Sequence, residues 1–323
     1  MFRRKSAGEL LRAFFVTDVH GSDQCWVKFI NAAAAYKANV LILGGDITGK
    51  RVVPIVPVNG HYVATMGSGE VRLESGDEIR DFQKQAANAG LYAFQATSDD
   101  VAELETDPHA VEDYFLRLAR VRVEDWLTLA EDRLAGSGVR LIINCGNDDP
   151  MELDEILRSS DIAVFAEGRT VEIDDRRSLV SVGFANQTPW QCPRDTTEDD
   201  LARRIREAVG EVGADTELVF NLHCPPYDSG LDMAPQLTED MSTVMAGGQP
   251  VMIPVGSTSV RAAIEQYQPI ASLHGHIHEG RGVTKIGRTL VVNPGSEYPD
   301  GVLRGALIDF NDNGIKGYVL TSG

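Results

Sequence analysis

The sequence is poor in cysteine, in long apolar runs and in basic residues, and each shortage excludes a class of protein. Cysteine occurs only 4 times in 323 residues, and no two cysteines form a CxxC pair. Neither a disulfide framework nor a cysteine-based zinc site is therefore indicated. No apolar run approaches the ~20 residues that span a bilayer, and the basic start MFRRKSAGELLR lacks a signal-peptide core. We expect a cytoplasmic protein with reduced thiols and no membrane partner.

The shortage of basic residues limits the partners. The 30 Lys and Arg residues face 48 Asp and Glu residues, which gives a formal net charge of −18. Binding a long nucleic acid needs a basic stripe that follows the phosphate backbone, and the sequence shows none. A nuclease acting on long DNA is therefore disfavoured. The 43% hydrophobic content is nevertheless ordinary, and it predicts a globular protein with a large core.

Buried strands alternate with helices along most of the chain, which predicts an α/β fold. Five apolar segments each run directly into polar residues: 11–17, 39–43, 139–144, 217–222 and 269–273. Three segments between the strands are predicted helices: 23–38, 197–212 and 257–266. Strands that are apolar throughout and end in polar residues are typical of a buried sheet with its functional edge at the strand carboxyl ends.

One stretch that interrupts the alternation is interpreted as an insertion over about residues 51–136. Residues 51–73 predict a hairpin with its turn at Asn59–Gly60 and a further short strand. Residues 77–136 predict helix, broken by an acidic linker at Thr97–Pro108. We expect this insertion to lie outside the functional edge and to serve in packing or in contacts of an oligomer.

A second interruption is a predicted loop excursion at residues 224–256, which as a plain surface excursion would contain a short helix at about 238–246. Loops of this length are uncommon unless they are functional or disordered. Two interpretations stay open, a loop that shapes the substrate site and a plain surface excursion. The whole chain, residues 1–323, is expected to form a single domain.

Polar residues that can bind metals follow the predicted strands in a fixed order. The blocks are Asp18-x-His20, Gly45–Asp46, Gly146–Asn147–Asp148, His223 and Gly275–His276–Ile277–His278. A single histidine at the end of a strand is more often structural than a ligand. Histidine, carboxylate and amide oxygen together are ligands of Mn, Fe or Zn, and the ordered set therefore points to a metal site.

This ordered set resembles the calcineurin-like metallophosphoesterase superfamily, whose blocks are D-x-H, G-D, G-N-H-D/E, H and G-H-x-H. The segments GGDITGK, HCPPY and VNPGSEYPDG are similar to its Icc-type branch of predicted phosphoesterases. The resemblance covers residues 11 to about 310 and implies two packed β-sheets flanked by helices. It also implies hydrolysis of a phosphoester by in-line attack of a hydroxide that bridges two divalent metal ions, with Mn favoured over Fe or Zn.

The resemblance also implies the ligands of each ion. One ion is assigned to Asp18, His20, Asp46 and His278, and the other to Asp46, Asn147, His223 and His276. Asp46 is thus the bridging ligand. Residues two apart in an extended segment point the same way, so that Asp18 with His20, and His276 with His278, are able to face one cavity.

The third block departs from the family pattern at Asp148, where the family usually has a histidine thought to protonate the leaving group. A carboxylate beside two cations stays ionised and is a poor proton donor. With Asp46, Asn147 and Asp148 as the catalytic set, we expect a phosphodiesterase acting on a small phosphorylated metabolite. A phosphomonoesterase and a non-catalytic protein of the same fold are the alternatives.

Five further residues are not expected to bind metal. His274 alternates away from His276 and is expected in the core or behind the ligands, while His61 and His109 are expected to be solvated. Asn293 either orients the ligands or forms a turn, and Cys224 is expected to fill space.

Overall fold

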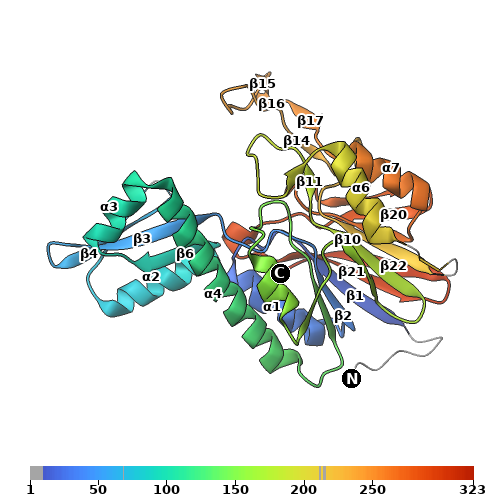
Figure 1. Cartoon of the computed structure of the whole chain (residues 1–323), viewed down its shortest axis with the longest axis horizontal. Coiled ribbons are helices and arrows are strands. Elements are labelled where there is room, and N and C mark those ends of the chain that lie inside the picture. Colours follow the sequence, from blue (N-terminus) through green and yellow to red (C-terminus); the bar gives the residue numbers. More distant parts are fainter. Residues whose placement is uncertain (1–9, 68, 211, 214–215) are drawn as a thin grey trace.

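The computed structural model describes residues 10–67, 69–210, 212–213 and 216–323. The basic residues of the amino-terminal segment 1–9 lie outside this part of the chain. The main body consists of two β-sheets packed face to face, with helices on both outer faces (Figure 1). This arrangement confirms the predicted fold class.

The first sheet has six strands in the order β22-β21-β1-β2-β7-β8. Its strands are β1 (Leu11–Val16), β2 (Val40–Leu43), β7 (Arg140–Ile143), β8 (Ala163–Phe165), β21 (Arg304–Asn311) and β22 (Gly314–Ser322). The pairings β1–β2, β2–β7 and β7–β8 are parallel, whereas β21 and β22 are antiparallel. The carboxyl ends of β1, β2 and β7 therefore meet at one edge.

The second sheet has five strands in the order β10-β13-β18-β20-β19. Its strands are β10 (Arg177–Val182), β13 (Glu217–Leu222), β18 (Ala271–Leu273), β19 (Gly282–Ile286) and β20 (Thr289–Asn293). All of its pairings are parallel except that of β19. The carboxyl ends of β13 and β18 thus come together as well.

Alternation along the strands explains the layers. In β1, Phe15 belongs to the core between the two sheets, whereas Phe14 belongs to the core under the helices of the first sheet. Those helices are α1 (Asp23–Ala35), α4 (Pro108–Leu134) and α5 (Leu153–Arg158). Helices α6 (Glu198–Val209) and α7 (Thr258–Tyr267) cover the second sheet. Both inner and outer faces are buried, which is why the strands are apolar throughout.

The insertion forms its own four-stranded sheet in the order β5-β4-β3-β6, packed on helices and set to one side of the main body (Figure 1). Its elements are β3 (Arg51–Val58), β4 (His61–Met66), β5 (Gly69–Leu73), α2 (Gly76–Asn88), β6 (Leu91–Gln95) and α3 (Ser98–Thr106). The predicted hairpin and third strand are confirmed, as is a helix over the region that α4 occupies.

Two predictions inside the insertion were wrong. Residues 91–95 form strand β6 instead of helix, because the segment pairs in parallel with β3 (Arg51 with Leu91), a tertiary contact that local pattern does not reveal. The predicted acidic linker Thr97–Pro108 contains helix α3. A capping box explains it, since the Thr97 and Asp100 side chains each accept a hydrogen bond from the other's backbone N–H.

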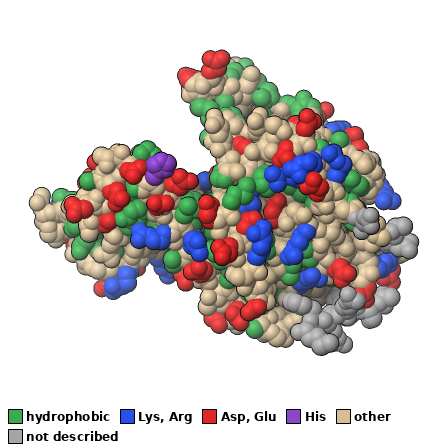
Figure 2. Space-filling model, viewed as in Figure 1, with side chains coloured by type: hydrophobic (Ala, Val, Ile, Leu, Met, Phe, Trp, Pro, Cys, Tyr) green, Lys and Arg blue, Asp and Glu red, His purple; other side chains and the backbone are tan. Residues whose placement is uncertain are grey.

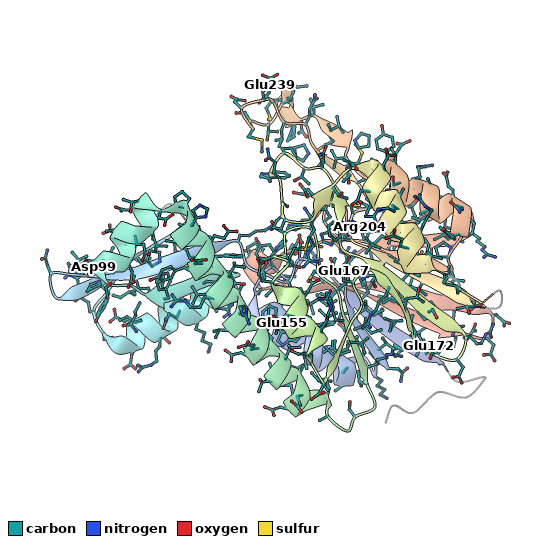
Figure 3. All side chains as sticks on the ribbon, in the orientation of Figure 1. Asp99, Glu155, Glu167, Glu172, Arg204 and Glu239 are labelled. Atoms are coloured by element: carbon teal, nitrogen blue, oxygen red, sulfur yellow. The ribbon has the colours of Figure 1, made fainter. Side chains whose placement is uncertain are left out.

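The excursion at 224–256 is a β-arm and not a loop with a helix. Strands β14 (Met233–Pro235) and β17 (Met252–Pro254) pair at its base, and β15 (Met245–Ala246) and β16 (Gln249–Pro250) pair near its tip. The short helix predicted at about 238–246 is absent, because Leu237 bridges to Thr243 and the Thr238 N–H donates to Ser242 O, which closes a turn instead of a helix. Glu239, labelled in Figure 3, lies at the outer end of the arm.

The remaining short elements are β9 (Arg169–Glu172), β11 (Ala185–Asn186), β12 (Asp195–Thr196) and the 3₁₀ turn η1 (Tyr298–Asp300). Within the described ranges, none of the helices combines the length and apolarity needed to cross a membrane.

Candidate metal centre

All seven predicted ligands lie on loops at the carboxyl ends of strands from both sheets. Asp18 and His20 follow β1, Asp46 follows β2, Asn147 follows β7, His223 follows β13, and His276 and His278 follow β18. Five of the seven are buried, and His276 and His278 are partly exposed. The topology thus collects, at one place, residues separated by up to 260 positions in the numbering.

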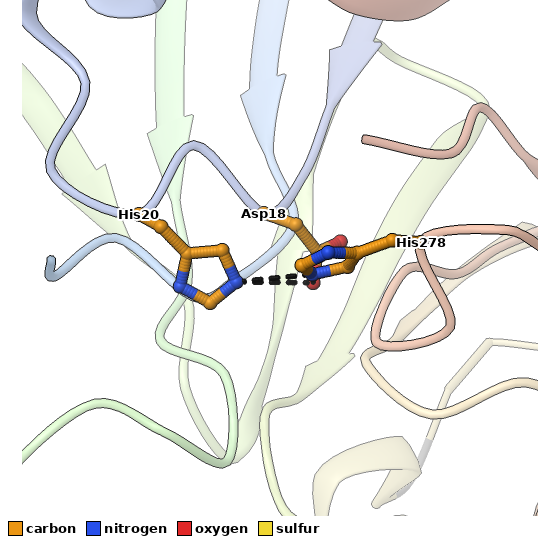
Figure 4. Close-up of side chains that lie close together, drawn as sticks. All are labelled: Asp18, His20 and His278. Atoms are coloured by element: carbon orange, nitrogen blue, oxygen red, sulfur yellow. Dashed lines mark hydrogen bonds and ion pairs between the residues drawn. The ribbon is translucent and has the colours of Figure 1, made fainter. Parts of the chain in front are cut away.

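The first group contains Asp18, His20 and His278, whose side chains converge (Figure 4). The Nε2 atoms of His20 and His278 are 3.1 Å apart, and Nε2 of His278 is 3.4 Å from Oδ1 of Asp18. On its other side, Nδ1 of His20 lies 3.3 Å from the Thr48 carbonyl oxygen. Donation to that carbonyl leaves the Nε2 lone pair of His20 directed into the group.

The second group contains Asp46, His223 and His276. One carboxylate oxygen of Asp46, Oδ1, lies 3.4 Å from Nε2 of His223. The other, Oδ2, lies 3.5 Å from Nε2 of His20 in the first group. Asp46 therefore stands between the two groups, as a bridging ligand must.

Unsatisfied buried atoms test whether this set fits a cation. Within the described part of the chain, Oδ1 of Asn147 and both ring nitrogens of His223 are buried without a hydrogen-bond partner. Buried polar atoms are ordinarily paired, so these lone pairs call for an additional partner. A mixed set of imidazole, carboxylate and amide oxygen suits Mn, Fe or Zn. The residues fit two divalent ions.

The surroundings raise the pKa values of two histidines in the cluster and lower those of the other two. Burial opposes protonation of His223, but the facing Asp46 carboxylate outweighs it and raises the pKa of His223 to about 9. Likewise, the bond to Asp18 overcomes burial and raises the pKa of His278. Burial lowers the pKa values of His20 and His276 to about 4. Binding of a cation to His223 at neutral pH should therefore release a proton, whereas binding to His20 or His276 should not.

Four ligands have a left-handed backbone, which is uncommon for residues other than glycine. The φ angles are 54° for Asp18, 39° for His20, 52° for Asp46 and 66° for His276. Interlocking hydrogen bonds hold them: Asp18 N–H donates to Gly45 O, His20 N–H to Asp46 O, and His276 N–H to the Asp18 carboxylate. Backbone strain of this kind is typical of functional sites.

Close packing explains two of the glycines in the ordered blocks. A Cβ atom at Gly146 would lie 2.2 Å from Oδ1 of Asp46, and one at Gly275 would lie 2.2 Å from Oδ2 of Asp18. Any side chain at these positions would displace a carboxylate of the candidate metal centre. The glycines are thus part of the cluster's geometry.

Asp148 lies beside the cluster and is paired with Lys50. Its backbone N–H donates to Oδ1 of Asp46 at 3.1 Å, and its carboxylate accepts from Nζ of Lys50. Oδ2 of Asp148 is 4.0 Å from Nδ1 of His20, too far for a hydrogen bond. Although burial opposes it, the nearby Asp46 and Asp148 raise the pKa of Lys50. Lys50 ends the segment GGDITGK but was not among the predicted site residues.

Two supporting carboxylates were also missed. The buried Asp149 accepts hydrogen bonds from the N–H groups of Gly146, Ile47 and Thr48, and so joins the loops after β2 and β7. Asp149 fills the D/E position of the third block, which was a usable signal. Asp195 accepts from Nδ2 of Asn147 at 2.9 Å and so points Oδ1 of Asn147 into the cluster. No sequence signal connected these two distant residues.

The other candidates are structural. His274 is buried, and its Nδ1 lies 2.7 Å from Leu222 O and 2.9 Å from Cys224 O, which ties the His223 loop to β18. Asn293 has both of its expected roles, since Nδ2 donates to Ile277 O and Oδ1 accepts from Gly295 N–H. All four cysteines, Cys25, Cys145, Cys192 and Cys224, are unpaired. His61 and His109 lie in the insertion, outside the cluster.

Among known proteins, sequence similarity covers only part of the chain. No family model matches the chain. An uncharacterized protein of Methanocaldococcus jannaschii is 30% identical over 151 residues, which cover 46% of this chain. The match spans 61% of that relative's length.

Comparison with solved structures supports the fold. One crystal structure superposes with a TM-score of 0.55 and 15% identity, covering 97% of this chain and 99% of the other. A structure described as an archaeal phosphodiesterase aligns over 97% of this chain and 100% of its own, with 13% identity and a TM-score of 0.38. The first superposition shows that this two-sheet α/β fold is shared with a known protein, and the second carries no conclusion.

Proposed function

We propose that the chain belongs to the calcineurin-like metallophosphoesterase superfamily and hydrolyses a phosphoester at the metal centre. The single observation that carries the proposal is the position of Asp46, whose two oxygens lie 3.4 Å from His223 and 3.5 Å from His20. Only a carboxylate placed in this way can serve both groups of ligands at once.

The residues of the candidate centre form two sets of ligands that share Asp46. Asp18, His20 and His278 would hold one ion with Asp46, and Asn147, His223 and His276 would hold the other with Asp46. Two divalent ions in such a site supply a nucleophile at neutral pH and positive charge that clamps the phosphoryl group for in-line displacement. Mn is our preferred metal, with Fe or Zn as alternatives. Asp195 and Asp149 keep the ligands in place.

A phosphodiester of a small metabolite is the substrate class that we favour. The Asp148 carboxylate is engaged by Lys50 and therefore offers no proton to a leaving group. This matters most for dianionic monoesters with poor leaving groups, since general acid catalysis is typically worth 10²–10⁴-fold. A phosphomonoesterase is the alternative enzyme, and a non-catalytic protein of this fold is the alternative without chemistry. The net charge of −18 favours a small substrate over a long nucleic acid and is compatible with the proposed cytoplasmic location.

The test compares two chromogenic substrates. The purified protein is stripped with a chelator, reloaded with Mn, Fe or Zn, and assayed with bis(p-nitrophenyl) phosphate and p-nitrophenyl phosphate. We expect metal-dependent turnover with the higher kcat/KM for the diester. A higher value for the monoester would favour the phosphomonoesterase, and no turnover with any metal would favour the non-catalytic protein.

A further inference from the structure

A cleft of about 560 Å³ lies beside the metal centre. One wall is the first part of α4, residues 108–116, which belongs to the insertion. The other walls are residues 49–52 after β2, residues 148–152 after β7, and Pro193. This volume is within the range of pockets that bind small organic ligands.

The cleft is continuous with the metal centre through Asp148 and Lys50. Asp148 lines the cleft and also groups with His20 and Asp46, with ligand atoms within 4.8 Å of one another. Lys50 lines the cleft and pairs with Asp148. A molecule in the cleft therefore places one end next to the cluster, with the Lys50 ammonium group at the boundary.

The lining is largely apolar, with charges of both signs. Its apolar side chains include Val52, Val111, Phe115, Leu116, Pro150 and Met151. Val111 and Met151 are 38% and 45% exposed, which is high for large apolar residues. The charged residues are Lys50, Arg51, Glu112, Asp148 and Glu152. Since acidic residues are at least as many as basic ones, the cleft does not suit a second phosphate or another polyanion.

Hydrogen bonds fasten the α4 wall to the loops that carry the ligands. Arg122 of α4 donates from Nη1 to Gly21 O at 2.6 Å, next to His20. The Tyr92 hydroxyl of β6 accepts from Gly49 N–H at 2.8 Å, and the Phe115 and Tyr92 rings pack nearly perpendicular to each other, with centroids 5.5 Å apart. Among the described residues, the insertion contributes no member to the candidate metal groups, but it does provide a fixed wall beside them.

We propose that this cleft binds the organic group of the phosphoester substrate, an uncharged apolar group at least as large as a phenyl ring. The phosphoryl group then lies over the metal centre, and the organic group contacts Val111, Phe115 and Met151. The inference rests on the proposed function and adds the substrate class to it. It also assigns substrate selection to the insertion, for which we had expected only packing or contacts of an oligomer.

Binding of two phosphonates that are not hydrolysed tests the proposal. Phenylphosphonate and methylphosphonate are titrated calorimetrically into the metal-loaded protein. Burial of the ring should make phenylphosphonate bind about tenfold more tightly than methylphosphonate. The variant Val111→Ser/Met151→Ser should bring this ratio close to one and leave methylphosphonate binding unchanged. Both positions are exposed, so the variant should fold.

The control is Val121→Ser, which changes a valine that is 50% exposed on the same helix and does not line the cleft. It should keep the wild-type ratio. An equal affinity of the wild type for both phosphonates, or an unchanged ratio in the double variant, would overturn the cleft assignment. If turnover of bis(p-nitrophenyl) phosphate is present at the same time, the proposed function survives. If the loaded protein neither binds a phosphonate nor hydrolyses the diester, both proposals fail.

Discussion

Asn147 depends on Asp195 for its orientation, since an acceptor beside the amide nitrogen fixes the opposite direction for the amide oxygen. The Asp195 carboxylate is that acceptor, and its second oxygen is held by Thr188 N–H at 2.9 Å and Cys192 N–H at 3.1 Å. Residues behind the ligands in this way commonly tune a metal site.

Asp195→Ala should weaken binding of one of the two ions about 10–100-fold, because Asn147 loses its fixed orientation. Metal titration followed by calorimetry measures it, with the other ion as internal reference. Asp195→Asn keeps one acceptor oxygen, but its NH2 group then faces either Nδ2 of Asn147 or the N–H groups of Thr188 and Cys192, so it should recover only part of the loss. Asp199→Ala, which removes an exposed carboxylate from α6, is the control. Wild-type affinity for both ions in Asp195→Ala would contradict the role of Asp195.

His274 makes the metal-free protein sensitive to acid. Burial lowers the pKa of His274 from 6.5 to about 4. Between these pH values, His274 is protonated in the unfolded chain and neutral in the folded protein. The contribution of His274 to the free energy of unfolding is fully present above pH 6.5. It falls by roughly 3 kcal/mol as the pH is lowered towards 4.

His274→Gln should be less stable than the wild type at pH 7, because its hydrogen bonds to Leu222 O and Cys224 O are disturbed. On going from pH 7 to pH 5 it should lose less stability than the wild type does. Urea unfolding of the metal-free proteins at several pH values measures both effects. Equal losses in the two proteins would show that His274 does not titrate as its burial implies.

At the scale of elements, the arm is a separable part of the chain. The Asp232 carboxylate at its base accepts from the N–H groups of Asp228, Ser229 and Gly256, so the base does not depend on the tip. No residue between β14 and β17 lines the cleft or belongs to a metal group in the described structure. The structure thus favours a surface excursion over a substrate-shaping loop.

Replacing residues 237–250 by a short Gly/Ser linker should leave metal content and kcat/KM for bis(p-nitrophenyl) phosphate within about twofold of the wild type. The reason is that the β14–β17 pairing at the base is kept. Metal analysis and steady-state kinetics measure the outcome. A large change in substrate preference with unchanged metal content would instead establish the arm as part of the substrate site.

The elements that the sequence predicted correctly are those with strong local signals. Strand β2 is an apolar run that ends at Gly44–Gly45–Asp46, and helix α1 begins after Ser22, whose hydroxyl accepts from Cys25 N–H. Strand β6 was missed because only its pairing with β3 makes it a strand. That the seven candidate ligands lie at the carboxyl ends of neighbouring strands could be predicted because the blocks are short and ordered. Lys50 and Asp195 could not, because their partners lie 98 and 48 positions away.

At the scale of the whole molecule, the net charge of the chain and the composition of the candidate site differ. Lys and Arg side chains lie among Asp and Glu on the face drawn in Figure 2, and a hollow separates the insertion from the arm there. Four histidines and one amide join only two carboxylates in the predicted ligand set. Two divalent ions would leave such a site positive, so that an anionic substrate can enter a protein of net charge −18.

The number of metal ions per chain, measured by elemental analysis of the wild type and of Asp46→Ala after loading with Mn, tests the central claim most directly. Because the two oxygens of Asp46 face both groups of ligands, the wild type should hold two ions and Asp46→Ala should hold far fewer. Circular dichroism confirms that the variant is folded. Two tightly bound ions in folded Asp46→Ala, or none in the wild type, would contradict the bridged metal centre.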